Sequence, residues 1–204
     1  MLFVLVPFFQ AHANADSLWT IWNDKTAVDT IRIKAMNELA WDVLFSQPDS
    51  AFIYAEKAYN FASQLDFKGL MAVSLNTQGA SYWVRGIHSK ALIYFKKSHE
   101  LFTELGDLSN SASCLNNMGI IYRSQGNNLK GLKYLIECLR IREQLQDSSG
   151  MPNILSNIGL IYQDQKNYKQ AMEYYKRSLA IRAVLADSAN MAGTLANIGL
   201  IFQI

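Results

Sequence analysis

The sequence predicts an all-α protein, built as a solenoid of antiparallel helix pairs, and three observations lead to this prediction. A glycine returns every forty residues, at Gly79, Gly119, Gly159 and Gly199, and an aromatic residue follows three positions after each of them. Apolar residues around these glycines are three and four positions apart, which places them on one face of a helix. Only three of the 204 residues are proline, whereas helix-favouring Ala, Leu, Lys, Gln and Glu are frequent.

Each forty-residue unit contains two predicted helices. A second landmark, again at intervals of forty, is formed by Tyr54, Tyr94, Tyr134 and Tyr174. Apolar residues around this landmark also follow helical spacing. Short polar segments such as SQGNN and DQKNY separate the two landmarks, so each unit is predicted to be a helical hairpin.

The predicted units cover residues 28–67, 68–107, 108–147 and 148–187, and a truncated fifth unit covers residues 188–204. Asp107, Asp147 and Asp187 stand where the next helix needs an N-cap. The fifth unit ends inside its first helix, so apolar residues such as Leu195 and Phe202 would have no second helix to cover them. We therefore expect the chain to be a fragment of a longer protein.

The recurring glycines have a packing interpretation. Where two helices cross closely, a side chain larger than Gly or Ala would push their axes beyond the usual distance of about 8–10 Å. A glycine inside a helix costs up to about 1 kcal/mol relative to alanine, so equivalent glycines in four units indicate a repeated contact. We expect Gly79 and Ala91 to mark one such crossing.

The N-terminal end of the repeat series departs from the pattern. Leu39 stands where the first unit should carry its glycine. Terminal repeats of solenoids are often atypical because they cap the stack. Residues 16–27 are predicted to form a short capping helix that covers this end with Trp19 and Trp22.

Residues 1–15 are predicted to be a signal peptide. An apolar run from Leu2 to Phe9 is followed by small residues in A-x-A form, ending at Ala13 or Ala15. The run is far shorter than the ~20 residues that a membrane-spanning helix needs. We expect export to the periplasmic or cell-surface side. No Lys or Arg precedes the run, which leaves a buried N-terminal helix and a cytoplasmic location as the alternative.

The composition indicates few special partners. The chain has 19 Lys+Arg and 17 Asp+Glu, for a net charge of +2, and no long run of like charge, so nothing indicates a nucleic-acid partner. Cys114 and Cys138 are the only cysteines, which excludes a disulfide framework. Their apolar helical positions favour buried thiols, although in an exported protein the two could pair.

Two sequence blocks carry a family resemblance. The first reads Leu-x2-Met-Gly-x2-Tyr from Leu115, and the second reads Ala-x3-Phe from Ala91 and Ala-x3-Tyr from Ala171. They resemble the tetratricopeptide repeat, whose signature is W-x2-L-G-x2-Y, then A-x3-F, then P, on a period of about 34 residues. The longer period and the missing proline are similar to the long-repeat type found in kinesin light chain, with about one added turn in the second helix. The resemblance covers residues 28–204 and implies a right-handed superhelical solenoid with a concave groove lined by first helices.

The sequence offers no constellation for catalysis. His12, His88 and His99 have no Cys, His or carboxylate partner at metal-ligand spacing. No GxSxG, Walker or HExxH motif occurs. We expect these residues to have no enzymatic activity, no metal site and no cofactor. This expectation does not extend to the activity of a full-length protein.

The candidate site residues lie on the first helices. A polar residue recurs two positions before each glycine or its equivalent, at Asn37, Thr77, Asn117, Asn157 and Asn197, with Asn76 and Asn116 beside it in two units. In the long-repeat relatives, asparagines at this place form a ladder that holds the backbone of an extended peptide; Thr77 interrupts that ladder here. The alternative is that each amide bonds a neighbouring helix of the solenoid.

Further candidates for the binding groove lie one turn either side of the polar column, and they are Trp83, Arg123, Gln163, Ala80, Ile120, Asn153 and Leu160. Tryptophan and arginine are the residue types that most often anchor a bound partner. Packing between repeats and a solvated charge are the alternative roles.

The expected function is therefore that of an exported, noncatalytic scaffold that binds a protein or an extended peptide segment. A leader followed by such repeats also resembles the sensory N-terminal region of bacterial signalling receptors, whose output domain is a histidine kinase, a nucleotide cyclase or a transcription regulator. That alternative rests on analogy. If the predicted signal peptide of residues 1–15 is not cleaved, we expect an intracellular adaptor instead.

Overall fold

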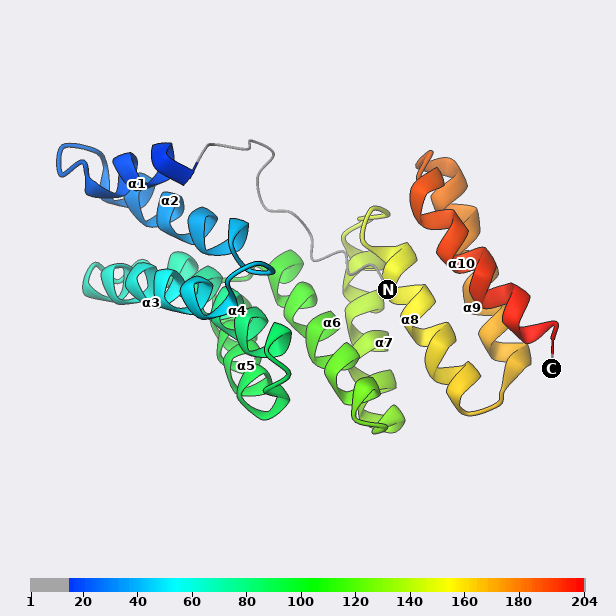
Figure 1. The fold of residues 1–204 in the computed structure, drawn as a ribbon. Coiled ribbons are helices and arrows are strands. Elements are labelled where there is room, and N and C mark those ends of the chain that lie inside the picture. Colours follow the sequence, from blue (N-terminus) through cyan, green and yellow to red (C-terminus); the bar gives the residue numbers. More distant parts are fainter. Residues whose placement is uncertain (1–14, 204) are drawn as a thin grey trace. The chain divides into compact units, whose positions relative to one another are not determined.

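The computed structural model describes residues 15–203, and these residues form ten helices and no strand (Figure 1). In chain order the helices are α1 (Ala15–Asn23), α2 (Asp29–Asp42), α3 (Pro48–Gln64), α4 (Lys68–Val84), α5 (His88–Glu104), α6 (Leu108–Ser124), α7 (Asn128–Gln144), α8 (Met151–Asp164), α9 (Tyr168–Val184) and α10 (Ser188–Ile201). Successive helices pack as antiparallel pairs, such as α4 with α5 and α8 with α9. The predicted all-α architecture of helix pairs is confirmed.

The chain divides into two compact units, with the boundary inside α6 between Cys114 and Leu115. We call the part before this boundary the N-terminal unit and the part after it the C-terminal unit. In the N-terminal unit α4 packs against both α3 and α5, and in the C-terminal unit α9 packs against both α8 and α10. An inner helix thus has neighbours on two sides, which is how a solenoid covers apolar surface that one hairpin leaves exposed.

The forty-residue period is made of helices and connections of constant length. From α4 to α7 every helix has seventeen residues, and three residues connect each helix to the next. A period of about 34 residues with the same connections would leave about 14 residues for each helix. The added length is therefore shared by both helices, and the prediction that it lies in the second helix alone is wrong.

The recurring glycines occupy matching close contacts. Gly79, Gly119 and Gly159 each face a large side chain sixteen positions later, on the second helix of the same hairpin, whereas Gly199 has no such contact. Measured from a Cβ atom built on the glycine, the pairs are Gly79 with Phe95 at 2.9 Å, Gly119 with Leu135 at 2.7 Å, and Gly159 with Tyr175 at 2.6 Å. Cβ atoms essentially never approach another heavy atom to under 3.0 Å, so these positions have no room for a side chain. The predicted repeated crossing is confirmed for these three glycines.

Helix α1 overlaps the range of residues 16–27 predicted for a capping helix, but it begins at Ala15 and ends at Asn23. Its Leu18 is buried against α2 and α3, with 2% of its surface exposed. Trp19 meets Tyr54 edge to face at 5.4 Å between ring centroids, and Trp22 meets Phe61 in the same way at 5.6 Å. Edge-to-face pairs of this kind add to the burial of their apolar area. The predicted signal peptide lies outside the described residues, apart from Ala15.

The predicted N-caps differ among the turns. Asp107 and Asp187 accept hydrogen bonds from the backbone N–H groups three residues later, at 3.1 and 3.4 Å. Asp147 caps no helix, because α8 begins only at Met151. Its carboxylate accepts instead from the backbone N–H of Ser149 at 3.1 Å. The N-cap prediction for Asp147 is therefore wrong.

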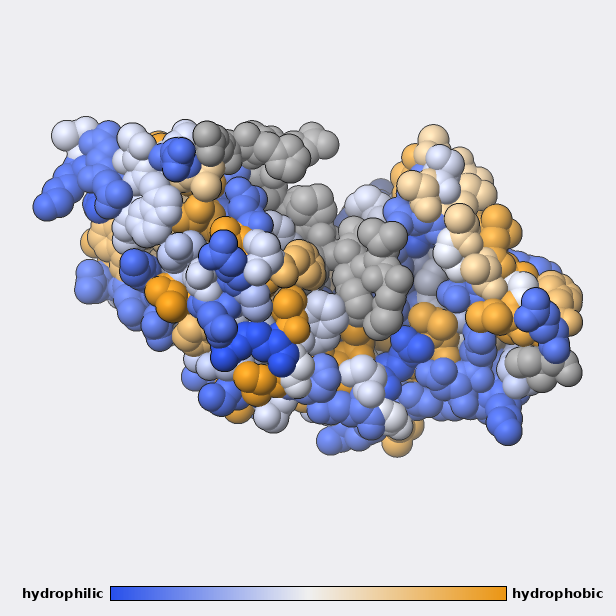
Figure 2. Space-filling view, viewed as in Figure 1, coloured by the Kyte–Doolittle hydropathy of each residue, from blue (hydrophilic) through white to orange (hydrophobic). Residues whose placement is uncertain are grey.

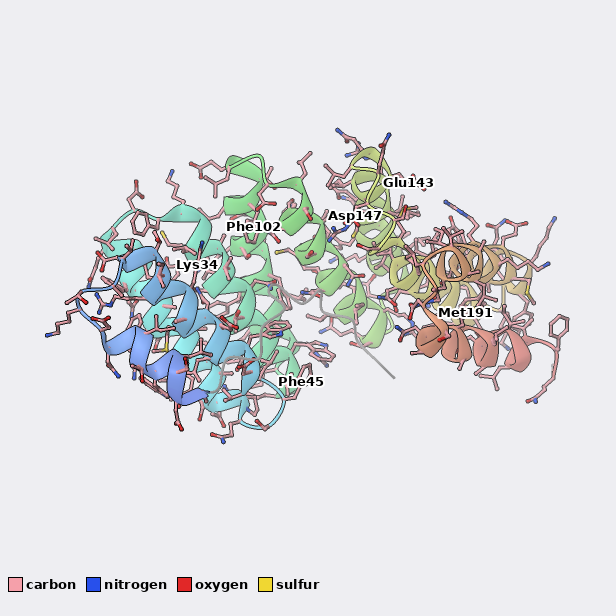
Figure 3. The ribbon with its side chains drawn as sticks, turned by 90° about the horizontal axis from the view of Figure 1, so that it is seen from above. Lys34, Phe45, Phe102, Glu143, Asp147 and Met191 are labelled. Carbon is pink, nitrogen blue, oxygen red and sulfur yellow. The ribbon has the colours of Figure 1, made fainter. Side chains whose placement is uncertain are left out.

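Asp147 has a different partner, a buried arginine. Arg142 and Arg182 are forty residues apart, each with 4% of its surface exposed, and they form ion pairs with Asp147 and Asp187 respectively. Figure 3 shows Asp147 next to Glu143 near the end of α7. Arg182 also donates to the side-chain carbonyl of Asn153 at 2.6 Å. Each of these two ion pairs joins the last turn of a second helix to the connection that follows it.

Cys114 and Cys138 are both buried, and neither forms a disulfide. Burial raises the pKa of Cys138 to about 12. A thiol with so high a pKa is protonated near neutral pH and is a poor nucleophile.

Candidate binding surface of the first helices

All predicted site residues lie on α2, α4, α6, α8 and α10, the first helices of the hairpins. Each of these helices has two distinct faces. On α8, Leu155 and Ile158 are fully buried, and Gly159 faces α9. Asn157 and Leu160 lie on another face of the helix and are half-buried. The polar column is therefore on the side of the first helix that its own hairpin partner does not cover.

In the N-terminal unit the polar column takes part in internal packing. Asn37 is 6% exposed, and its side-chain carbonyl accepts a hydrogen bond from the Ser74 hydroxyl of the next hairpin at 2.9 Å. Thr77 is 3% exposed, and its hydroxyl donates to the backbone carbonyl of Val73 at 3.3 Å. Trp83 is half-buried near the end of α4. Asn37 therefore has the alternative role of bonding a neighbouring helix.

In the C-terminal unit the column is different. Asn117, Asn157 and Asn197 occupy equivalent positions on α6, α8 and α10, and Asn117 is the most enclosed, with 8% of its surface exposed. Asn157 and Asn197 are half-buried. The structure gives none of these three side-chain amides a hydrogen bond to any residue between 15 and 203. A primary amide offers both donors and an acceptor, so three such groups are free to bind another chain.

A second polar column lies directly beside the first. Asn76 accepts a weak hydrogen bond from the thiol of Cys114 at 3.7 Å, and the hydroxyl of Ser156 lies 3.4 Å from that of Thr194. Both contacts join two successive first helices. At the corresponding place opposite Asn116 the sequence has Ile154, which has no polar atom. The side-chain oxygen of Asn116 is buried and has no hydrogen-bond partner among the described residues.

Arg123 and Gln163 are both held by neighbouring side chains. The Nε of Arg123 donates to the carboxylate of Asp164 in the next hairpin at 3.1 Å, and the terminal guanidinium nitrogens bond no other described residue. The side-chain carbonyl of Gln163 accepts from the hydroxyl of Tyr175 at 2.8 Å. Burial raises the pKa of Tyr175, so this hydroxyl remains a donor. The structure thus gives Arg123 and Gln163 a packing role, and leaves part of the Arg123 guanidinium available.

Sequence reasoning missed Asp164 and Tyr175 as members of this cluster. Asp164 is 41 residues from Arg123, one more than the repeat period, so the spacing alone does not single it out. Tyr175 was identified only as the aromatic residue of its block. Their roles depend on which side chains two adjacent hairpins bring together.

The described residues offer few groups suited to catalysis or metal binding. His99 Nδ1 lies 2.8 Å from the Ser111 hydroxyl, but Ser111 is 1% exposed and cannot reach a substrate. Within residues 15–203 there is no group of three His, Cys, Asp or Glu side chains that could hold a metal ion. The same residues include no helix that is both long and apolar enough to cross a membrane.

Solved structures with the same fold come from several proteins. BtubC (BKLC) from P. vanneervenii is 19% identical, with a TM-score of 0.71 over 84% of this chain and 71% of that protein. A Rap protein complexed with competence and sporulation factor is 16% identical, with a TM-score of 0.78 over 93% of this chain and 57% of that one. A signal transduction ATPase with a tetratricopeptide repeat sensor from Pyrococcus horikoshii is 16% identical, with a TM-score of 0.77 over 87% of this chain and 28% of that one.

At these identities the similarity shows the fold alone. None of the curated proteins matches the sequence. The tetratricopeptide repeat model matches three overlapping stretches, residues 70–144, 110–183 and 150–204, which together cover most of the chain. A fold of this kind is typically a noncatalytic scaffold. The recurring glycine contacts, the helix pairs and this match lead to one conclusion: the chain belongs to the tetratricopeptide repeat family.

Proposed function

We propose that this protein is a noncatalytic scaffold that binds an extended peptide segment of a partner protein along the first helices of its C-terminal unit. One observation carries the proposal. Asn117, Asn157 and Asn197 present side-chain amides at equivalent positions, and the fold provides none of them with a hydrogen-bond partner among the described residues. The polar atoms of these amides are not fully buried, so another chain can reach them, and a peptide backbone has the matching donors and acceptors.

The spacing of the amides suits an extended chain. Equivalent helices that pack about 10 Å apart match about three residues of extended peptide at ~3.3 Å each. Three amides at about 1 kcal/mol net would supply about 3 kcal/mol, whereas micromolar affinity needs about 8 kcal/mol. The rest must come from side-chain contacts. Leu160 and the terminal nitrogens of Arg123 lie on the same helices and offer one apolar and one charged contact.

The proposal can be tested with peptides selected from a random library displayed on phage, using residues 16–204 as bait. We expect the variant N157A/N197A to bind the selected peptides about tenfold to thirtyfold more weakly, because two hydrogen bonds of about 1 kcal/mol each are lost. Binding is measured by fluorescence anisotropy with labelled peptides. The melting temperature should stay within about 2 °C of the wild-type value, because these amides bond nothing within the fold.

The matched control is N153A. Asn153 lies on the same helix as Asn157, but its side-chain carbonyl accepts from Arg182. We therefore expect N153A to lower the melting temperature, in contrast to N157A/N197A. Selected peptides that bind N157A/N197A as tightly as the wild type would rule out a role for the amides. A large fall in melting temperature of that variant would show that the amides are structural.

A second candidate function is a sensory region of an exported signalling receptor. The sequence motif that favours it is the apolar run and A-x-A tail within residues 1–15, and the Pyrococcus horikoshii protein similar in fold is described as carrying a tetratricopeptide repeat sensor. Fusing residues 1–204 to alkaline phosphatase, which is active only after export, tests the leader in bacteria. We expect activity from this fusion and little from one that lacks residues 1–15. Equally low phosphatase activity from both fusions would argue for the intracellular adaptor.

A further inference from the structure

The charged side chains of the C-terminal unit are distributed unequally between its first and second helices. The first helices are α8, α10 and the part of α6 after Cys114, and they carry only two charged side chains, Arg123 and Asp164. Every other charged side chain between residues 115 and 203 lies on α7, on α9 or in a connection between helices. A solvated helix face normally carries charge, whereas the centre of a contact surface is depleted in it. The helices that present the amide column are thus nearly free of charge.

The two charges on these first helices neutralise each other. Arg123 Nε lies 3.1 Å from the carboxylate of Asp164, and the two side chains are 22% and 43% exposed. A carboxylate of a partner that approached the terminal nitrogens of Arg123 would also approach Asp164, and repulsion would offset the attraction. A neutral carbonyl oxygen meets no such repulsion. The pair therefore offers hydrogen-bond donors without a net charge.

Apolar side chains lie one helical turn from the amides. Ile120 follows Asn117 by three positions on α6, and Leu160 follows Asn157 by three positions on α8, a spacing that places each pair on one face. Ile120 is 9% exposed and Leu160 is half-buried. Figure 2 shows hydrophobic colouring over the middle of α8 and hydrophilic colouring over the turn that joins α8 to α9. A charged side chain placed against these residues would lose water without gaining an opposite charge.

We propose that the peptide segment bound by this surface is uncharged and places an aliphatic side chain against Ile120 and Leu160. We call the surface the neutral stripe, and its residues are Asn117, Ile120, Arg123, Asn157, Leu160 and Asp164. This inference rests on the proposed function, in which the amides hold the backbone of the same segment, and it adds the chemistry by which the segment is chosen. Acidic and basic segments are rejected because each of their charges would be desolvated without a counter-charge.

The first test is the composition of the peptides that the phage selection on residues 16–204 yields. We expect Asp, Glu, Lys and Arg to be depleted at least about threefold relative to the unselected library. The affinity of the tightest-binding selected peptide, measured by fluorescence anisotropy, should change less than about twofold between about 50 mM and about 500 mM salt, because no ion pair holds it.

The second test places a charge in that peptide. It is synthesised with glutamate in place of each residue in turn, and with glutamine in place of each residue in turn. We expect glutamate to weaken binding at least about tenfold at one or more positions, because a desolvated carboxylate has no counter-charge there. Glutamine has nearly the same shape without the charge, and at the same positions it should weaken binding less than about threefold.

The decisive variants are D164N and its matched control E143Q. Each removes one negative charge and keeps an oxygen that accepts a hydrogen bond from its arginine, which is Arg123 for Asp164 and Arg177 for Glu143. Glu143 and Arg177 lie on α7 and α9, outside the neutral stripe, and are 3.0 Å apart. In D164N the charge of Arg123 is no longer neutralised, so at least one glutamate peptide should regain about fivefold or more in affinity. E143Q should leave all affinities within about twofold.

The aliphatic contact is tested by L160A and its matched control L129A. Leu129 lies on α7 outside the neutral stripe and is 80% exposed. We expect L160A to weaken the selected peptide at least about fivefold through the loss of apolar contact, and L129A to leave its affinity within about twofold. Circular dichroism of each variant checks that it remains folded. Equal binding to L160A and wild type would exclude the aliphatic contact.

Other outcomes would overturn the inference. Selected peptides that are rich in charge, or that lose about tenfold in affinity as the salt rises, would do so while leaving the proposed function intact if N157A/N197A still weakens them. Uncharged peptides that bind N157A/N197A as tightly as the wild type would instead refute the proposed function, and this inference with it. Recovery of the glutamate peptides in E143Q as well as in D164N would mean that overall charge sets the preference.

The chain itself contains a segment of matching chemistry, because residues 2–9 are uncharged and apolar. Comparing residues 1–204 with residues 16–204 distinguishes this segment from a partner protein as the occupant. We expect the two forms to bind the selected peptide within about twofold of each other. Binding to residues 1–204 that is at least about tenfold weaker would make the chain's own segment the occupant and would overturn the proposal of a partner.

Discussion

At the scale of single residues, the connections between helices share a residue with positive φ, which the residue types alone do not indicate. From residue 66 to residue 186, a residue with positive φ recurs every twenty positions, once in each connection. Three of these are Gly86, Gly106 and Gly126, with φ between 71° and 75°. Lys166 and Ala186 adopt φ of 60° and 53° in the same place. A non-glycine residue in this region is strained by about 1–2 kcal/mol.

We therefore expect K166G to stabilise the protein by up to about 1 kcal/mol, because glycine relieves that strain although it adds freedom to the unfolded chain. The matched control is G126A. A Cβ atom on Gly126 would meet nothing within 4 Å, so its effect is that of the backbone alone. We expect G126A to destabilise by about 1 kcal/mol. Urea unfolding followed by circular dichroism measures both changes, and a K166G variant less stable than the wild type would contradict this account.

The glycines inside the first helices are expected to respond in opposite directions. A methyl group on Gly159 would lie 2.6 Å from the Tyr175 ring, so G159A should destabilise by about 1–3 kcal/mol through overpacking. The same change at Gly199 meets nothing, and G199A should stabilise α10 by up to about 1 kcal/mol through helix propensity. The melting temperatures of the two variants, compared with that of the wild type, test both expectations. Similar shifts in both would mean that the contact at Gly159 is unimportant.

At the scale of helices, the buried Arg142 and Arg182 couple α7 and α9 to the connections that follow them. Position 102 of α5 corresponds to Arg142 and Arg182, yet it holds Phe102, which is also 4% exposed. The fold therefore accepts either an apolar ring or a paired guanidinium at this place. An ion pair so enclosed is costly to break, because the remaining charge stays buried.

This pairing predicts a sensitivity to acid. Burial acts to raise the pKa of Asp147, but hydrogen bonds from Ser149 and the charge of Arg142 outweigh it and lower the pKa below the ordinary value of 3.8. A carboxylate whose pKa is lower in the folded state stabilises the fold above its unfolded pKa and loses this contribution as the pH falls through its folded pKa. We expect the contribution to be complete near pH 6 and to fall below about pH 4.

The variant D147N isolates this effect. At pH 7 it should be less stable than the wild type by about 1–3 kcal/mol, because Arg142 remains buried without a charged partner. Below the folded pKa of Asp147 the difference should shrink, since the wild-type carboxyl is then protonated as well. Urea titrations at several pH values give the comparison. A difference that does not change with pH would mean that packing, and not charge, accounts for the loss.

At the scale of the whole molecule, stability is expected to be local. In a repeat protein each hairpin contacts mainly its neighbours, so the loss of a cap weakens the nearest hairpin first. Helix α1 covers α2 and α3 with Leu18, Trp19 and Trp22. The aromatic cluster also holds the guanidinium of Arg32 at 4.8 Å from the ring centroid of Phe61.

Deleting residues 1–23 should therefore speed amide hydrogen exchange in α2 and α3 at least about tenfold, which corresponds to a loss of about 1.4 kcal/mol or more. Exchange in α8 and α9 should not change, because these helices belong to the other unit. Mass spectrometry of exchanged peptides resolves the two regions. Equal acceleration in both would show that the chain unfolds as one cooperative body, which the repeat architecture does not predict.

The repeat and its packing follow from the order of the residues along the chain. The period of forty, the two helices in each unit and the glycine crossings follow from residue spacing, because helical geometry converts a spacing of three or four directly into a shared face. The same reasoning located α1 and the columns of polar residues on the first helices. These features depend on contacts within a hairpin, where the two partners are close in the chain.

Which polar side chains already have a hydrogen-bond partner depends on how the hairpins pack against one another. Asn37 bonds Ser74, whereas the equivalent Asn117 bonds none of the described residues. The difference lies in the residue that the next hairpin supplies 37 positions later, which is Ser74 for Asn37 and the apolar Ile154 for Asn117. The burial of Arg142, which is 4% exposed, is likewise a result of tertiary packing. A repeat period fixes positions, but a hydrogen bond or an ion pair depends on the chemistry of both partners across the interface.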